Sequence, residues 1–279
     1  MDNSDIDRGF ARLTEGLVHY RERAAADGGN DMPPLLLLHA SPNSSRSVEP
    51  IMQAYPPGRR LVAPDNPGNG DSVRPAAAQP EMHDYADMLD RFCDALGLET
   101  VDIFGSHTGA HIGLELAVRR PERVRRLVVD GLLVLDAEQR EDFLANYAPH
   151  KEPDEAGSQF HWAWQYIRDQ MIFFPHYRKD REHLRVGGVF DAEFLHEMTM
   201  DVLRSLRTYH LAYEAVFRHD VAARLGELQQ PIRWLDSGHG YLDDALRLMQ
   251  EQAAAASVVE VPHAPADFAS AINEFCSHD

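Results

Sequence analysis

A histidine stands at the centre of a glycine-framed turn within the stretch Val101–Ala117. The stretch opens with a short apolar run, typical of a strand, and closes with an apolar segment that indicates a buried helix. Between the two, Gly105 and Gly109 bracket three residues, and the middle one is His107. This is the frame of a nucleophile elbow, a sharp strand-to-helix turn that exposes one side chain at the top of a parallel sheet. The central residue of such a turn is normally Ser, and sometimes Asp or Cys.

The imidazole of His107 could do two kinds of chemistry. It could attack a carbonyl as a nucleophile and form an acyl-imidazole that water then clears. It could also act as a general base on water or on a substrate C–H or O–H group, because an ordinary imidazole is mostly neutral at pH 7. Ser106 is a rival nucleophile, although a residue beside the centre of the elbow normally points elsewhere.

Three further segments surround the elbow in a fixed order. Leu35–Pro42 is an apolar run followed by a turn, Pro64–Ser72 is a second strand-end turn, and His263 comes late in the chain. In this order and spacing the chain resembles the α/β-hydrolase family along nearly its whole length. The resemblance implies an α/β fold with a mostly parallel central sheet flanked by helices, and with an inserted helical cap.

The resemblance also implies a triad around His107. His263 matches the family's histidine in the loop after the last strand, and a carboxylate should fix its tautomer. We expect that carboxylate to be Asp130, which follows an apolar strand, as the acid does in haloalkane and fluoroacetate dehalogenases. Asp236 and Asp243 are the alternatives, because the usual acidic slot near them holds Gly240.

Two backbone N–H groups should form the oxyanion hole. Thr108 follows the elbow centre, and Ser41 lies in the turn after the first parallel strand. Ala40 stands in this turn where the family usually has Gly. His39 is a candidate substrate contact, although it is more typical of a residue that bonds the turn from below.

Residues 136–228 interrupt the strand–helix alternation and are rich in aromatic residues and histidine. We expect them to form a helical cap between two parts of the hydrolase core, residues 1–135 and 229–279. Arg168 could bind an anionic substrate group or form a surface ion pair. The pair His161-Trp162 resembles one in dehalogenases, but the Asp nucleophile of those enzymes is missing. The candidate substrate contacts are His39, Ser106, His161, Trp162, Trp164, Arg168, Phe173 and Tyr213.

The remaining pattern predicts ordinary elements of an α/β protein. A hairpin is expected over Gly9–Arg23. Strands are expected at 34–39, 60–63, 101–104, 124–129, 232–235 and 257–261, and helices at 82–96, after the elbow to about 120, and at 242–256 and 267–275.

Composition narrows the class of protein. A net charge of −18 argues against a nucleic-acid surface and against binding to anionic membranes. Two cysteines give no disulfide framework, and neither a signal peptide nor a membrane span is visible. A cytoplasmic enzyme that acts on a small-molecule substrate is therefore expected. A homodimer is compatible with the sequence. No cofactor and no metal are expected, since His107 and His111 lack the His-Glu-x-x-His spacing of zinc enzymes.

The first functional hypothesis is cofactor-free hydrolysis of a small ester, lactone or related bond, with His107, His263 and Asp130 at its centre. A second keeps the site but makes His107 the general base of a lyase, decarboxylase or cyclase. A third is a hydrolase-like protein that binds a small molecule without turnover.

Overall fold

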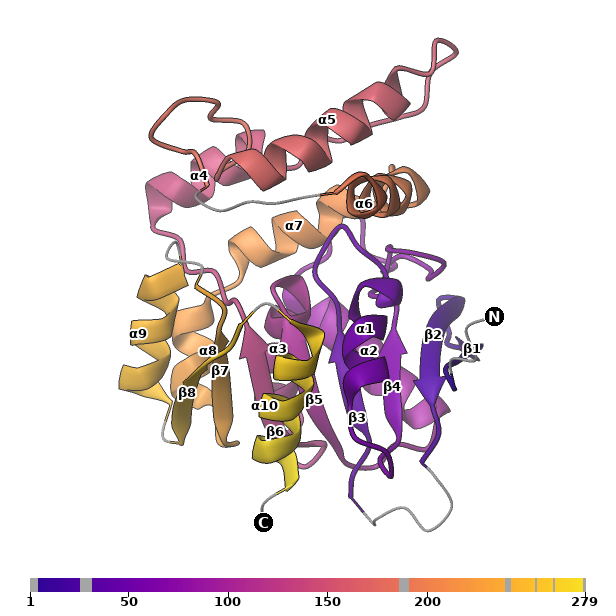
Figure 1. Ribbon diagram of the computed structural model, residues 1–279, viewed down its shortest axis with the longest axis vertical. Coiled ribbons are helices and arrows are strands. Elements are labelled where there is room, and N and C mark those ends of the chain that lie inside the picture. Colours follow the sequence, from indigo (N-terminus) through magenta and orange to yellow (C-terminus); the bar gives the residue numbers. More distant parts are fainter. Residues whose placement is uncertain are drawn as a thin grey trace.

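The computed structural model describes residues 5–25, 32–185, 191–238, 242–253, 255–262 and 264–277. At its centre is an eight-stranded sheet with the order β1-β2-β4-β3-β5-β6-β7-β8 (Figure 1). β1 and β2 pair antiparallel, β2 joins β4 antiparallel, and every pair from β4 to β8 is parallel. The strands are Asp7–Arg12, Leu17–Arg23, Leu35–Leu38, Leu61–Pro64, Val101–Ser106, Val124–Asp130, Ile232–Asp236 and Ala256–Glu260.

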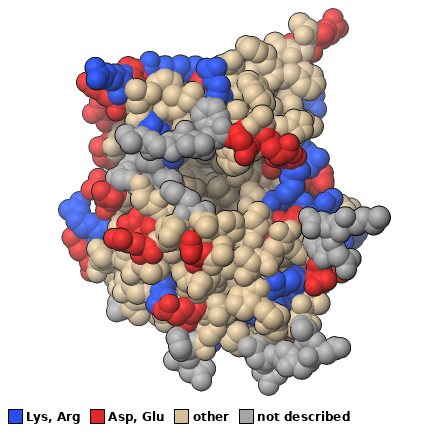
Figure 2. Space-filling view, in the orientation of Figure 1, with Lys and Arg blue, Asp and Glu red and all other residues tan. Residues whose placement is uncertain are grey.

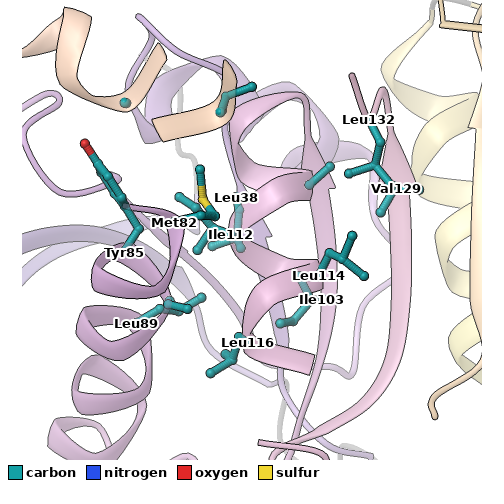
Figure 3. Packing of buried hydrophobic residues seen from close by; sticks show 14 of the residues in the cluster. Leu38, Met82, Tyr85, Leu89, Ile103, Ile112, Leu114, Leu116, Val129 and Leu132 are labelled. Atoms are coloured by element: carbon teal, nitrogen blue, oxygen red, sulfur yellow. The ribbon is translucent and has the colours of Figure 1, made fainter. Parts of the chain in front are cut away.

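Both faces of the sheet are covered, which explains the unbroken apolar runs of its central strands. Because side chains alternate along a strand, Leu36 and Leu38 of β3 enter one core cluster while Leu35 and Leu37 enter the other. The larger cluster lies on the side of α2 (Met82–Ala95) and α3 (Thr108–Arg119), where Leu38 and Ile112 lie beside Met82, and Val129 lies near Leu132 (Figure 3).

The flanking helices divide between the two faces. α8 (Val221–Glu227) and α9 (Asp243–Gln252) continue the layer of α2 and α3, since α8 packs on both α3 and α9. The opposite face carries α1 (Glu49–Ala54) and α10 (Pro265–Ser277), which pack on each other. The short 3₁₀ helix η1 (Ser45–Val48) precedes α1.

Four more helices lie across the carboxyl ends of the parallel strands (Figure 1). They are α4 (Ala137–Asn146), α5 (Ser158–Ile172), α6 (Ala192–Arg204) and α7 (Tyr209–Arg218), and we call them the helical layer. They fall inside the segment 136–228 that the sequence marks as an insertion. Its last helix, α8, instead packs beside the sheet, so the boundary near 228 stays a prediction.

The predicted α/β fold is confirmed, and the predicted strands and helices lie within a few residues of their expected bounds. The helix α1 was not predicted, because its six residues are too few to show a period. Each helix in the described ranges is too short or too polar to span a lipid bilayer.

The elbow glycines lie very close to neighbouring backbone. A Cβ on Gly109 would lie 2.2 Å from the Leu38 carbonyl oxygen, and one on Gly105 would lie 2.5 Å from the Gly109 oxygen. Neither neighbour is a side chain that could rotate away. The packing of β3, β5 and α3 therefore depends on the absence of a side chain at both positions.

This packing predicts a difference between two glycine-to-alanine substitutions, both within helices. Gly109→Ala should lower the free energy of unfolding by about 1–3 kcal/mol, because α3 must move away from β3. Gly226→Ala is the control, since a Cβ there has no atom closer than 3.9 Å and alanine favours the helix. Urea unfolding followed by circular dichroism measures both. Equal stability of Gly109→Ala and the wild type would contradict the described contact.

Candidate active site

His107 occupies the point where β5 ends and α3 begins. Its backbone has φ 46° and ψ −109°, and among the described residues it is the one non-glycine residue with positive φ. This conformation costs roughly 1–3 kcal/mol and persists only when the surrounding packing enforces it. The His107 N–H donates to the Asp130 carbonyl oxygen at 2.8 Å. The predicted elbow is thus present, with an imidazole at its centre.

The imidazole lies against the loop that follows β6. A Cβ on Gly131 would be 2.7 Å from the His107 Nδ1 atom, and Gly131 itself has φ 86°. Burial lowers the pKa of His107 below its ordinary value. The negative charge of Asp130 opposes this shift, and the positive charge of Arg185 adds to it. The ring is therefore held in its neutral form, in which it can accept a proton or attack an electrophile.

Asp130 lies at the end of β6, next to the elbow, and its side chain is 9% exposed. Its carboxylate accepts hydrogen bonds from Ser237 Oγ at 3.0 Å and from Ser106 Oγ at 3.3 Å. Asp236 instead accepts the Gly238 N–H, and Asp243 is exposed in the first turn of α9. Ser237 is a site residue that the sequence did not indicate.

The predicted bond between this acid and His263 concerns a residue outside the described part of the chain. The same holds for His239 and Gly240. The assignment of the acid consequently stays a prediction, which the position of Asp130 beside His107 supports.

The two predicted oxyanion residues lie in contact. The Ser41 N–H donates to Thr108 Oγ1 at 3.3 Å, and Thr108 is the first residue of α3, where the helix dipole favours negative charge. The hydroxyl of Tyr213, from α7, donates to the Ser41 carbonyl oxygen at 2.7 Å. Tyr213 was predicted to contact substrate, and the structure uses its hydroxyl to hold the loop that carries Ser41.

His39 supports this loop from below, and its prediction as a substrate contact is wrong. The side chain is fully buried, Nδ1 bonds to the Ala40 carbonyl oxygen, and Nε2 accepts the Asn66 N–H. Asp65 joins the same two loops, because it accepts the N–H groups of Ser45 and Asp71. Burial opposes the ionisation of Asp65, but hydrogen bonds from His19, from Ser45 and from the backbone N–H of Asp71 hold its pKa far below the ordinary range.

A cavity of about 770 Å³ lies between the elbow and the helical layer, within the range of small-molecule sites. Figure 2 shows the hollow on this face of the molecule. Its floor includes Ser106 and Asp130 at the ends of β5 and β6. Its walls come from η1, α1, α6 and α10, and include Arg46, Val48, Ile51, Glu193, Phe194, Glu197, Met198, Asp201 and Phe268.

The sequence placed half of the candidate substrate contacts on α5, whereas the described cavity wall uses α6. His161 is exposed, Trp162 stacks on Tyr166 with ring centroids 4.9 Å apart, and Arg168 pairs with Asp169. Trp164 packs against the core, and Phe173 bridges to Leu184. The aromatic residues of α5 indicated a substrate-binding helix, but tertiary packing decided that α6 faces the described cavity.

A metal centre at the elbow has little support among the described residues. His111 uses both ring nitrogens, one for the Leu133 N–H and one for His219. The one described group of three ligand-type side chains within metal-binding reach is His19, Asp65 and Asp71. Because His19 and the backbone already saturate Asp65, this group holds loops together.

Comparison with known proteins agrees with this geometry. The family model described as the alpha/beta hydrolase fold matches residues 33–172, half of the chain. A 2-hydroxymuconate semialdehyde hydrolase of Pseudomonas sp. (strain CF600) is 40% identical over 101 residues, covering 35% of this chain and 36% of that protein. A haloalkane dehalogenase of Mycolicibacterium paratuberculosis is 33% identical over 136 residues, covering 47% and 43%. The matches thus span about two fifths of the length of these curated relatives.

Solved structures extend the likeness in fold to the whole chain. A hydrolase from Pseudomonas aeruginosa PA01 superposes with a TM-score of 0.70 at 18% identity, over 98% of this chain and 99% of that one. The epoxide hydrolase CorEH reaches a TM-score of 0.74 at 18% identity, over 98% and 99%. With the elbow, the sheet order and the family match taken together, the chain belongs to the α/β-hydrolase fold family.

Proposed function

We propose that this protein is a cofactor-independent hydrolase of a small ester, lactone or related bond, with His107 as its central catalytic group. The observation that carries the proposal is the strained elbow backbone, which presents a neutral imidazole beside Asp130, and Asp130 lines a cavity of about 770 Å³. Such strain is typical of sites where a side chain must be presented for reaction. The relatives named as hydrolases support the reaction class and leave the substrate open.

In the nucleophilic route, a ring nitrogen of neutral His107 attacks the carbonyl carbon of the substrate. The developing oxyanion would accept the N–H groups of Thr108 and Ser41, the latter exchanging its long bond to the Thr108 hydroxyl. The alkoxide leaves with the proton of the other His107 ring nitrogen, which gives the alcohol and a neutral acyl-imidazole, and water then hydrolyses that intermediate to the acid and the free imidazole. The charge of Asp130 stabilises the cationic ring during both steps.

A second candidate follows from the residue type at the elbow. An imidazole in place of a hydroxyl needs no covalent intermediate, so His107 could remove a proton from water or from a substrate carbon. The latter reaction is that of a lyase, decarboxylase or cyclase. Trapping an acyl adduct and detecting it by mass spectrometry distinguishes the nucleophilic route, because a general base forms none. Binding without turnover of any substrate would instead favour a ligand-binding protein.

Substitutions at the elbow test the role of His107. His107→Ala should reduce turnover of a panel of p-nitrophenyl esters and small lactones by at least about 10²-fold, the usual contribution of one acid–base group. Ser106→Ala is the comparison variant and should lose much less activity, because it removes only a long hydrogen bond to Asp130, with circular dichroism checking the fold of both variants. His107→Ser restores the usual nucleophile and should keep ester hydrolysis. If Ser106→Ala is inactive and His107→Ala is not, Ser106 is the nucleophile.

The second prediction tests the acid. Asp130→Asn should lower kcat by about 10²-fold or more, because the carboxylate no longer stabilises a positive imidazole. Asp243→Asn should match the wild type, since that side chain is exposed on α9. The same ester panel measures both variants. A larger loss of kcat in Asp243→Asn than in Asp130→Asn would show that Asp243, and not Asp130, is the acid.

The third prediction concerns pH. Activity requires neutral His107, so kcat/KM should fall with decreasing pH only below the ordinary imidazole value of about 6.5. Arg185→Gln removes a charge that lowers this pKa, so the acid limb should move to higher pH. Arg185→Lys retains the charge and should leave the limb in place. A limb that stays fixed in Arg185→Gln would contradict the assignment of this limb to His107.

A further inference from the structure

A chain of buried polar side chains lies behind the elbow, on the side of α3 that faces α7 and α8. His111 Nδ1 and His219 Nδ1 are 2.9 Å apart, and His219 Nε2 is 3.2 Å from Glu115 Oε2. Arg224 Nε approaches the same Glu115 oxygen at 2.8 Å. At the other end, the Leu133 N–H donates to His111 Nε2 at 3.1 Å. The side chains of Glu115, His111 and His219 are at most 5% exposed.

The two ends of this hydrogen-bonded series, the Leu133 N–H and the Glu115 carboxylate, fix the direction of every hydrogen bond between them. The Leu133 N–H can only donate, so His111 Nε2 must be unprotonated and Nδ1 must carry the hydrogen. His219 Nδ1 then accepts, and its Nε2–H donates to Glu115. Burial favours the neutral acid, but the hydrogen bond from His219 and the charge of Arg224 keep the pKa of Glu115 below its ordinary value. Burial also keeps the pKa of His111 well below 6.5, so that ring is neutral.

The opposite arrangement of protons would break the contact with the loop. If His219 carried its hydrogen on Nδ1, His111 Nδ1 would have to accept that hydrogen bond, and the hydrogen of His111 would then be on Nε2. That hydrogen would face the Leu133 N–H, and two donors would oppose each other. The Glu115 carboxylate selects against this arrangement, because it can only accept from His219.

The loop held in this way is the one that borders the elbow. Residues 130–133 are joined to the start of α3 twice, by the His107 N–H on the Asp130 oxygen and by Leu133 on His111. Between the two bonds, Gly131 lies against the His107 ring. The position of Asp130 and Gly131 relative to the imidazole therefore depends on both bonds.

We propose that Glu115 and His219 are positioning residues, which orient His111 so that it holds the loop 130–133 beside the elbow. The structural part of this inference is independent of the reaction, and its catalytic consequence rests on the proposed function. Neither residue contacts the reacting atoms. Glu115 acts through its hydrogen bond with His219, and His219 acts through its hydrogen bond with His111.

The first test observes the protons themselves. Nitrogen-15 NMR of protein labelled at histidine distinguishes protonated from unprotonated ring nitrogens, and the variant His219→Gln assists assignment among the 15 histidines. Wild-type protein should show His111 as the Nδ1–H tautomer and His219 as the Nε2–H tautomer. A wild-type His111 protonated on Nε2 would overturn the proposal without any variant.

The second test removes the acceptor. Glu115→Leu should speed amide hydrogen exchange at Leu133 by about tenfold or more, the size expected when a buried hydrogen bond is lost. Glu115→Gln keeps an acceptor oxygen and should restore slow exchange. With an ester substrate, Glu115→Leu should lower kcat more than it changes KM, and Glu115→Gln should restore kcat. Unchanged Leu133 exchange in Glu115→Leu would refute the inference.

The two proposals can fail separately. If Glu115→Leu speeds Leu133 exchange but the wild-type protein turns over no ester or lactone, the hydrolase proposal is refuted and the positioning role remains. A loss of kcat in Glu115→Leu with unchanged Leu133 exchange would do the opposite.

Discussion

The contact between Gly109 and the Leu38 carbonyl oxygen is the constraint on which the rest of the site depends. It brings the start of α3 against the end of β3, and the chain between β5 and α3 turns there with positive φ at His107. The strain at His107 is sustained because the two cores on either side of the sheet fix β3, β5 and β6. His107 is thereby presented from a turn that is held between two packed core clusters.

Around this point, loops from different parts of the chain are held by side chains that are themselves buried. His39 and Asp65 bond the loops after β3 and β4 to each other, and Tyr213 reaches down from the helical layer to the Ser41 carbonyl. On the far side of α3, His111 holds the loop after β6. Such a shell of hydrogen bonds keeps candidate catalytic groups in place, so that little reorganisation is needed during reaction.

Partial burial and two nearby charges set the protonation of the imidazole. Burial disfavours the charged ring, and Asp130 and Arg185 act on it in opposite directions. The cavity beside it combines apolar walls such as Phe104, Phe268 and Met198 with acidic side chains from α6.

The sequence by itself determined the fold class and the elbow. Local rules control both: four consecutive leucines require a sheet covered on two sides, and Gly105 and Gly109 allow only one turn geometry around His107. Asp130 could be named because a strand end is a local feature. Only the tertiary structure decided that α6 rather than α5 lines the cavity, and that His219 meets His111. The residues of that last pair are 108 positions apart, and no local pattern records which distant side chains packing brings together.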